Sequence, residues 1–571
     1  MRYEKLAEVY DKLASTTKRL EKISILSGFL DDVKKEDSDI MYLLEGRIYP
    51  SYDERNIGIS NQIAIKAISK STGTPSKKVI SLWKKKGDLG EVSKELTKTK
   101  KQMTLASHVL TTQKVVDNLR KLPELEGKGT IEKKLSLITE LLTSASPIES
   151  LYLIRTLIGD LRIGVQESTI KYAILRAFFN DNKEYEEDLQ NAIDRSNDLR
   201  EVFEYAIGKD IKDLEKIKLE VGKPIKAMLA QKAKDIDDAF KHLGAPLGVE
   251  YKYDGFRLLI HKKGDKITLF TRSLENVTRQ FPEVIGYIKE FIKGDSFILD
   301  SEAVGYDRKT KKYTDFQAIS QRIRRKYDIG KLSDKLPVEV NIFDVLYYNG
   351  KSELETPFKE RAELVRKIIK EHPYKLIASK MIITSERKEV ESFYKKALKD
   401  NQEGVMFKNL ESPYKPGRRV GNMLKMKPEE SELDLVITGG EWGTGKRSGW
   451  ISSFNLSCKS GDEYLEIGKV GTGIGEKENE ENKVTFDELT NLMRPLITKE
   501  KGKEISVRPK IVVTVHYQDI QKSPNYKSGW ALRFPRITSI REGDKPLSEI
   551  ATLEEVEKNF LEQRSRNYKY G

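Results

Sequence analysis

The sequence predicts a multidomain protein that begins with an all-α domain, continues with an α+β domain and ends with an all-β barrel. In the first part of the chain, apolar residues such as Tyr3, Leu6 and Val9 recur at the three-to-four spacing of amphipathic helices. Near Gly222 the pattern changes to short runs rich in Val, Ile, Phe and Tyr, with helical segments between some of them. After Pro428 about five short strand-like runs follow one another closely, which fits a small barrel.

These changes of pattern give the expected domain boundaries. We expect a helical domain at residues 1–222, an α+β domain at residues 223–428 and a barrel at residues 429–571. A helical pattern, TLEEVEKNFLEQR, ends the barrel segment and is expected to pack on it. The acidic stretch at residues 429–432, EESE, lies where the last two domains meet and is the expected hinge.

The composition restricts the class of protein. No apolar run approaches the roughly 18 residues of a membrane helix, so we expect no membrane association. A single cysteine, Cys458, excludes an internal disulfide and a cysteine-rich zinc site, which suits a reducing cytoplasm. The net charge of +14 favours a polyanionic partner, because basic residues bind phosphates.

Lys252 is the candidate catalytic residue. It lies in the segment EYKYDGFR with an acid two residues away on either side, Glu250 and Asp254. Strand alternation puts the three on one face if the strand extends that far. An amine must lose its proton to attack, and nearby cations, desolvation or a metal ion favour that loss. Arg257 adds a planar cation suited to phosphate, although a solvated strand end is the alternative interpretation of the lysine.

The segment EYKYDGFR resembles motif I of the covalent nucleotidyltransferases, which include the DNA ligases, RNA ligases and capping enzymes. Further segments resemble the later motifs of this superfamily in the same order: TRSLENVT, ILDSEAVGYD, FDVLYYNG, EGVMFK, GNMLKMKP and SPNYKSGWALRFPR with REGDK. Any one of these segments has an ordinary structural explanation, since Phe343 could be a core residue and Lys425 a solvent-facing lysine. The ordered set favours the resemblance.

The resemblance implies a role for each matching residue. Lys252 would attack the α-phosphate of ATP and carry AMP. The implied nucleotide-binding residues are Glu250, Arg257, Arg272, Glu302, Phe343, Arg419, Lys425 and Lys427. Among these, Phe343 would stack on the base and Glu250 would read the adenine amino group. The implied ligands of Mg²⁺, or of Mn²⁺ in its place, are Glu302 and Glu403. The same motifs include Asp300, Arg533, Asp544 and Lys545.

The N-terminal stretch LYLIRTLIGDLRIGVQESTI resembles the helical DNA-binding domain of archaeal and eukaryotic replicative ATP-dependent DNA ligases. The implied fold is this domain, an α+β nucleotidyltransferase domain of ATP-grasp-like type, and an OB-fold barrel. The implied activity is ATP-dependent sealing of nicks in double-stranded DNA through a lysyl-AMP intermediate. AMP transfer to the 5′-phosphate and attack by the 3′-hydroxyl follow. Such an enzyme serves DNA replication, repair and recombination, and so cell division, and we expect a cytoplasmic monomer.

Several alternatives stay open. An RNA ligase or an mRNA-capping nucleotidyltransferase would share most of the motifs, and a non-catalytic nick sensor would share the DNA-binding part. Met423 stands where the family usually has tryptophan, and Arg541 is separated from Asp544 by one residue more than usual. ADP, GTP or NAD could replace ATP, although the NAD-dependent enzymes carry a cysteine zinc module that this chain lacks. A sliding clamp is a candidate partner, because residues 102–109 match the first half of a clamp-binding pattern.

Overall fold

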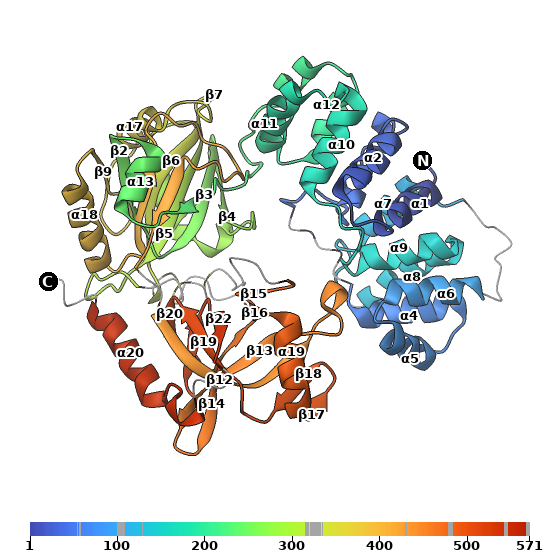
Figure 1. Cartoon of the computed structure of the whole chain (residues 1–571). Coiled ribbons are helices and arrows are strands. Elements are labelled where there is room, and N and C mark those ends of the chain that lie inside the picture. The colour runs from blue at the N-terminus through green and yellow to red at the C-terminus, as the bar shows by residue number, and fades with distance from the viewer. Residues whose placement is uncertain are drawn as a thin grey trace. The chain divides into compact units, whose positions relative to one another are not determined.

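Figure 1 shows a computed structural model of the chain. The chain divides into two compact units. The first contains Met1–Arg387 with Met406–Lys425, and the second contains Lys388–Val405 with Met426–Gly571. The structure describes residues 1–53, 55, 57, 59–99, 109–127, 129–314, 319, 322, 333, 335–428, 431–477, 484–541 and 546–566. Within these ranges, no helix has both the length and the apolar character that crossing a membrane requires.

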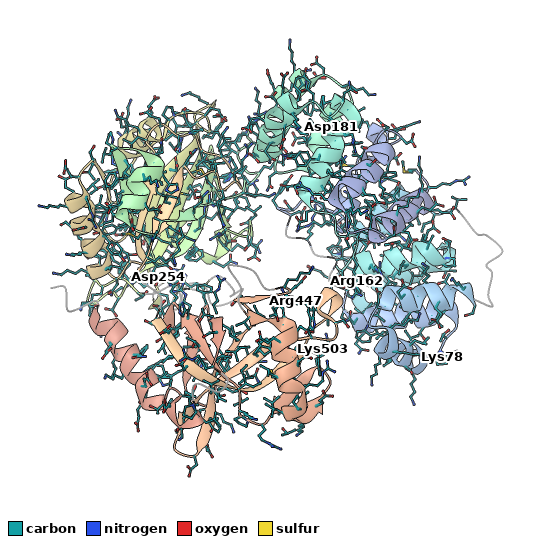
Figure 2. All side chains as sticks on the ribbon, in the orientation of Figure 1. Lys78, Arg162, Asp181, Asp254, Arg447 and Lys503 are labelled. Atoms are coloured by element: carbon teal, nitrogen blue, oxygen red, sulfur yellow. The ribbon has the colours of Figure 1, made fainter. Side chains whose placement is uncertain are left out.

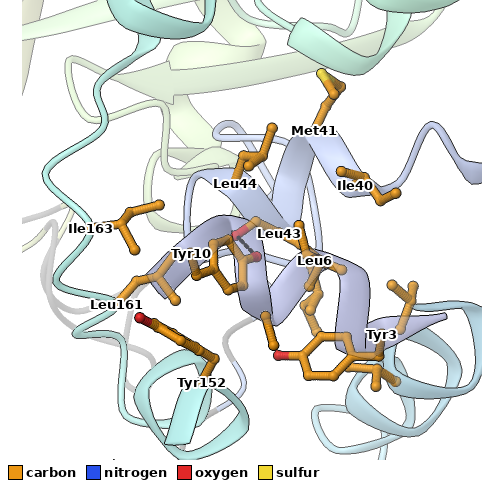
Figure 3. Close-up of a cluster of buried hydrophobic side chains, with 14 of the residues drawn as sticks. Tyr3, Leu6, Tyr10, Ile40, Met41, Leu43, Leu44, Tyr152, Leu161 and Ile163 are labelled. Atoms are coloured by element: carbon orange, nitrogen blue, oxygen red, sulfur yellow. Dashed lines mark hydrogen bonds between the residues drawn. The ribbon is translucent and has the colours of Figure 1, made fainter. Parts of the chain in front are cut away.

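The N-terminal part of the first unit is helical. Its helices are α1 (Tyr3–Ala14), α2 (Arg19–Leu30), α3 (Ile40–Leu44), α4 (Asn61–Thr72), α5 (Ser76–Lys86), α6 (Leu89–Lys98), α7 (Thr112–Lys121), α8 (Thr130–Ser144), α9 (Pro147–Leu157), α10 (Glu167–Phe179), α11 (Glu186–Ser196) and α12 (Leu199–Ala206). The expected apolar stripe of α1, including Tyr3 and Leu6, is buried in the core. In that core the hydroxyl of Tyr10 donates a hydrogen bond of 2.7 Å to the carbonyl of Leu43 (Figure 3).

Two sheets form the centre of the α+β region. The first has the strand order β1 (Gln231–Lys232), β11 (Met423–Met426), β10 (Gly404–Lys408), β2 (Leu247–Lys252) and β9 (Met381–Thr384). The second has the order β4 (Lys266–Thr271), β3 (Phe256–Lys263), β5 (Ser296–Gly305), β6 (Val338–Tyr348) and β7 (Lys351–Ser352), with β8 (Leu376–Ala378) beside β6. The helices of this region are α13 (Ile236–Leu243), α14 (Pro282–Phe291), α17 (Phe358–Ile368) and α18 (Arg387–Lys399).

The two faces of the second sheet differ in chemistry. Leu258 on β3, Leu299 on β5 and Val340 on β6 belong to one buried cluster together with residues of α14 and α17. Because strand side chains alternate, the opposite face carries the intervening residues. Among these are Arg257 and Glu302, so the sheet directs its predicted site residues away from this cluster. The same face also carries Leu259 and Ile298, which belong to a second buried cluster.

The second unit is rich in strands. They are β12 (Ser431–Trp442), β13 (Ile451–Ser460), β14 (Glu463–Val470), β15 (Ile474–Gly475), β16 (Val484–Thr485), β17 (Ile497–Lys501), β18 (Glu504–Val507), β19 (Val512–Tyr517), β20 (Asp519–Lys522), β21 (Trp530–Arg533) and β22 (Arg536–Ile540). The long strand β12 pairs with β13 along one edge and with β18 and β19 along the other. This unit also contains α19 (Phe486–Met493) and α20 (Leu553–Arg566). The ring of Phe560 on α20 lies 4.5 Å from that of Trp530, so the final helix packs on the strands as expected.

The predicted fold class is confirmed: a helical N-terminal region is followed by a central α+β region with two sheets and by a C-terminal strand-rich region. The exact domain boundaries stay a prediction. The second compact unit also contains Lys388–Val405, which comes from the segment expected to form the central domain.

His261 makes the stability of this fold depend on acidity. The side chain is buried on β3, and its Nδ1 accepts a hydrogen bond of 2.9 Å from the backbone N–H of Gly222. Burial lowers the pKa of His261 to about 3. In the unfolded chain a histidine has a pKa of about 6.5, so between these values only the unfolded state binds the proton. Stability should therefore fall as the pH falls from about 6.5 towards 3.

Replacing His261 by asparagine is expected to remove this part of the acid sensitivity, because the asparagine Oδ1 can accept the Gly222 bond without titrating. Between pH 7 and pH 4.5 the wild-type chain should lose about 2 to 3 kcal/mol that the variant does not lose. Urea unfolding at the two pH values measures this difference. The control is His242→Asn, at an exposed histidine of α13. Equal pH dependence in His261→Asn and wild type would contradict the assignment.

Candidate active site

Lys252 is the last residue of β2, a strand that lies between β10 and β9 in the first sheet. Its side chain is half-buried, and that of Glu250, on the same strand face, is buried. Asp254, which is labelled in Figure 2, lies beyond the end of β2. Of the three residues that the pattern placed on one strand face, Glu250 and Lys252 are therefore the two that share it.

Lys408 lies at the candidate site, although the sequence motifs predicted no role for it. Its Nζ lies 2.6 Å from Oε2 of Glu250, and both side chains are about 95% buried. Burial raises the pKa of Glu250, and the charge of Lys408 opposes that rise. The same ammonium lies 5.0 Å from the ring centroid of Phe343, the residue expected to stack on the base. The signal was present in the sequence, since Lys408 ends the motif segment EGVMFK.

Phe343 owes its position to a bulge in β6. On the neighbouring strand β5, Ser301 pairs with Ile342 and Asp300 pairs with Asp344, so Phe343 has no partner of its own. A bulge inserts one unpaired residue and re-aims its side chain. Phe343 is half-buried, in contrast to Ile342 and Asp344 on either side of it.

Arg257 forms a buried hydrogen-bonded group with Asp300. Its Nε and Nη2 lie 2.6 Å and 2.5 Å from the two carboxylate oxygens of Asp300. The hydroxyl of Tyr414 accepts a bond of 2.8 Å from Arg257 and donates one of 2.9 Å to Asp300. Burial works against the charge of Arg257, but Asp300 and Tyr414 outweigh it and raise the pKa of the guanidinium above its ordinary value. Arg257 is therefore fixed in orientation before any ligand binds.

Glu302 and Asn341 supply oxygen atoms that suit a hard divalent cation. Glu302 is half-buried on β5, and it pairs with Arg257 on β3 on one side and with Asn341 on β6 on the other. Asn341 is fully buried, and within the described residues its Oδ1 has no hydrogen-bond partner. The described part of the chain contains no group of three or more His, Cys, Asp or Glu side chains that could hold a metal. The residues fit Mg²⁺, which binds oxygen, needs few protein ligands and keeps waters and substrate phosphates.

Glu403 and Lys427 lie in the second compact unit, where they contact each other. Lys427 Nζ is 2.6 Å from Oε2 of Glu403, and Nη2 of Arg533 is 3.5 Å from Oε1. Glu403 immediately precedes β10 and Lys427 follows β11. The carboxylate expected to bind metal is thus balanced by two cations in this structure. Lys425 is half-buried on β11, beside the short strand β1, which the sequence pattern did not predict.

The structure does not bring every predicted residue together. Arg272, in the turn after β4, and Arg419 both have exposed side chains. Arg418, the neighbour of Arg419, is hydrogen-bonded to several side chains of α11. Asp544, Lys545 and residues 102–108 of the clamp-like pattern lie outside the described residues.

Comparisons with known proteins agree along the whole chain. Residues 2–175 match the family model of the DNA ligase N terminus, residues 227–427 that of the ATP dependent DNA ligase domain, and residues 447–544 that of the ATP dependent DNA ligase C terminal region. The chain is 43% identical over 571 residues to a DNA ligase of Nanoarchaeum equitans, with 100% of both chains covered. It is 37% identical over 570 residues to a DNA ligase of Thermococcus fumicolans, with 99% of both covered.

A solved structure named Pmar-Lig_Pre has the same fold. Its TM-score is 0.57 at 17% sequence identity, and the match covers 94% of this chain and 99% of that one. At this identity the likeness bears on the fold alone. It agrees with the succession of helical, mixed and strand-rich regions described above.

Proposed function

Because this chain belongs to the family of ATP-dependent DNA ligases, we propose that its nick-sealing reaction starts at the amine of Lys252. The family uses ATP and a divalent metal, and its substrate is DNA. The observation that carries the proposal is the position of Lys252, half-buried at the end of a central strand, two residues from the buried ion pair of Glu250 with Lys408.

The chemistry proceeds in three transfers. The unprotonated Nζ of Lys252 attacks the α-phosphorus of ATP, an N–P bond forms, the α–β anhydride bond breaks and pyrophosphate leaves. An oxygen of the 5′-phosphate at the nick then attacks the same phosphorus, and the lysine amine leaves as the N–P bond breaks. Finally the 3′-hydroxyl loses its proton and attacks the 5′-phosphorus, which joins the strand and releases AMP.

The other residues bind and orient the nucleotide in this proposal. Phe343 stacks on the base, Glu250 reads its amino group, and Arg257 directs its charge to phosphate. The further predicted contacts are Arg272, Arg419, Lys425 and Lys427. A bound Mg²⁺ supplies neutralisation of phosphate charge, with Glu302 and Glu403 as its proposed ligands and Asn341 Oδ1 as an additional oxygen.

The experiment that tests the proposal is incubation with Mg²⁺ and either [α-³²P]ATP or [γ-³²P]ATP, followed by a denaturing gel. The α-label should stay on the protein and the γ-label should not, because pyrophosphate leaves. Addition of nicked duplex DNA should discharge the labelled protein and produce a sealed strand. Labelling by GTP instead, or sealing of RNA in preference to DNA, would support the capping or RNA ligase alternative. If neither [α-³²P]ATP nor labelled GTP left a label on the protein, the proposal would be wrong.

Replacing Lys408 by methionine is expected to lower the free energy of unfolding by about 3 to 5 kcal/mol, because the buried carboxylate of Glu250 loses its counter-ion. The double variant Lys408→Met with Glu250→Gln removes both charges and should recover most of the loss. Urea unfolding measures both, with Lys395→Met on the exposed face of α18 as the control. A cost below about 1 kcal/mol for the single variant would show that the pair contributes little.

The domain boundaries at 222/223 and 428/429 belong to the same proposal, with a hinge at residues 429–432, of which 429 and 430 lie outside the described residues. The matched family segments, which end at 175 and 427 and begin again at 227 and 447, support them. We further propose that the chain acts in the cytoplasm as a monomer on nicked double-stranded DNA. A sliding clamp is the candidate protein partner.

A further inference from the structure

The loop between β10 and β11, residues 409–422, contacts two different parts of the first compact unit. Near its middle, the hydroxyl of Tyr414 bonds both Arg257 and Asp300, as described above. That hydroxyl also accepts a bond of 3.1 Å from the backbone N–H of Met228. Tyr414 is buried, so this loop completes the hydrogen bonding of a proposed phosphate-binding residue.

Four residues further along, Arg418 is held by α11 of the helical region. Its Nε lies 2.6 Å from Oδ2 of Asp194, its Nη1 lies 2.9 Å from Oε1 of Glu187 and its Nη2 lies 2.9 Å from Oδ1 of Asn191. Only 16% of the Arg418 side chain and 8% of the Asp194 side chain are exposed. The bond to Asp194 is charge-assisted and buried on both sides, and such a bond is stronger than an exposed ion pair. The Glu187 side chain is 60% exposed, so its bond contributes less. These bonds fix the position of the loop relative to α11.

The loop next to Arg418 packs closely against Lys226. Gly417 has a φ of +70°, a left-handed conformation that other residues rarely adopt. A Cβ at this position would lie 3.2 Å from the Lys226 side chain, and Lys226 in turn pairs with Glu167 of α10. Two helices of the helical region therefore reach this loop, α11 directly and α10 through Lys226.

We infer that Arg418 is a positioning residue for self-adenylation, through which α11 of the helical region holds Tyr414 and so Arg257 in place. This rests on the proposed function, in which Arg257 binds a phosphate of ATP. The helical region then has a task in the first transfer, before any DNA is bound. Burial raises the pKa of Asp194 while Arg418 opposes that rise, which is consistent with mutual dependence of the two groups.

The test measures self-adenylation of the full chain as a function of ATP concentration, without DNA. Arg418→Met should raise the KM for ATP about tenfold, the equivalent of one charged hydrogen bond, with a smaller change in kcat. Arg418→Lys keeps the charge but not the fork, so its KM should lie between those of wild type and Arg418→Met. Exchange of the partners, Arg418→Asp with Asp194→Arg, should restore part of the affinity.

A double-mutant cycle separates positioning from general damage. Tyr414→Phe alone should raise the KM, and in that background Arg418→Met should add little, because the connection is already broken. The matched control is Lys223→Met, which breaks a different ion pair with the helical region, to Glu201 of α12, in which no residue of the loop takes part. Its KM for ATP should equal that of wild type.

Three results would overturn the inference: an unchanged KM in Arg418→Met, effects of Arg418→Met and Tyr414→Phe that simply add, or an equal rise in Lys223→Met. Thermal unfolding of each variant identifies any that fails to fold, and Arg418→Lys then serves as the test. If the wild-type chain takes no label from ATP, the proposed function itself is wrong. If the wild-type chain is labelled normally but one of the three results above is obtained, the inference about Arg418 is wrong and the proposed function still holds.

Discussion

The variant Lys252→Ala is expected to take no detectable label from [α-³²P]ATP, and its rate of sealing ordinary nicks should fall by about 10⁴-fold or more. No other group in the proposed mechanism forms the covalent bond to AMP, and removal of a nucleophile costs about this much in enzymes with covalent intermediates. The side chain is half-buried at a strand end, so its truncation should leave the fold intact. A denaturing gel and a nick-sealing assay give the two readouts.

A second substrate makes this prediction sharper. DNA that already carries AMP on the 5′-phosphate bypasses the lysine, so Lys252→Ala should still seal it at a rate within about tenfold of wild type. The control is Lys263→Ala, at the exposed end of β3, which should behave as wild type in both assays. If Lys252→Ala were labelled like wild type, another residue would be the nucleophile.

The second large effect is expected for Glu302→Gln, which removes one negative charge and keeps the shape of the side chain. Self-adenylation at a fixed Mg²⁺ concentration should slow by about 10²- to 10³-fold, the usual cost of losing one electrostatic group at a phosphoryl-transfer site. Because the charge attracts the cation, the rate of the variant should rise further than that of wild type as Mg²⁺ or Mn²⁺ is increased.

Binding of Mn²⁺ provides a readout for Glu302→Gln that does not depend on turnover. Electron paramagnetic resonance of free Mn²⁺ in the presence of ATP should show weaker retention of the ion by the variant. The control is Glu290→Gln, an exposed acid on α14 of the same domain. Loss of activity with unchanged Mn²⁺ retention would assign Glu302 to the nucleotide alone.

Local patterns were sufficient to predict the fold and the motif residues. The spacing of Tyr3, Leu6 and Val9 fixed a buried helix face, and the ordered motifs identified Lys252 and Glu302 on strands. The side-chain partners of these residues could not be predicted in this way. Glu250 pairs with Lys408 and Arg257 is completed by Tyr414, and both partners come from segments far along the chain that only tertiary folding brings near.

Adjacent residues of similar chemistry were a second difficulty. The motif predicts that Arg419 contacts the nucleotide, but it does not predict that its neighbour Arg418 bonds Asp194 and Glu187 of α11. Strand ends were a third: alternation could not show that β2 stops at Lys252 and leaves Asp254 outside it. A sequence pattern gives residue types and their spacing. The partners of a side chain and the point where a strand ends depend on which residues from distant parts of the sequence lie beside them in the folded chain.

Because Phe343 is the extra residue of the bulge in β6, its side chain does not depend on a pairing partner in β5. Since Ile342 and Asp344 already pair with consecutive residues of β5, deletion of Phe343 would remove this interruption of the ladder and leave only the second irregularity of the strand pair, at Ile298 and Leu299. Such a shortened chain should fold and melt much as the parent does while binding ATP poorly. The sheet can therefore gain or lose the ring that we propose stacks on the base in a single evolutionary step, without a change of register at the paired residues on either side.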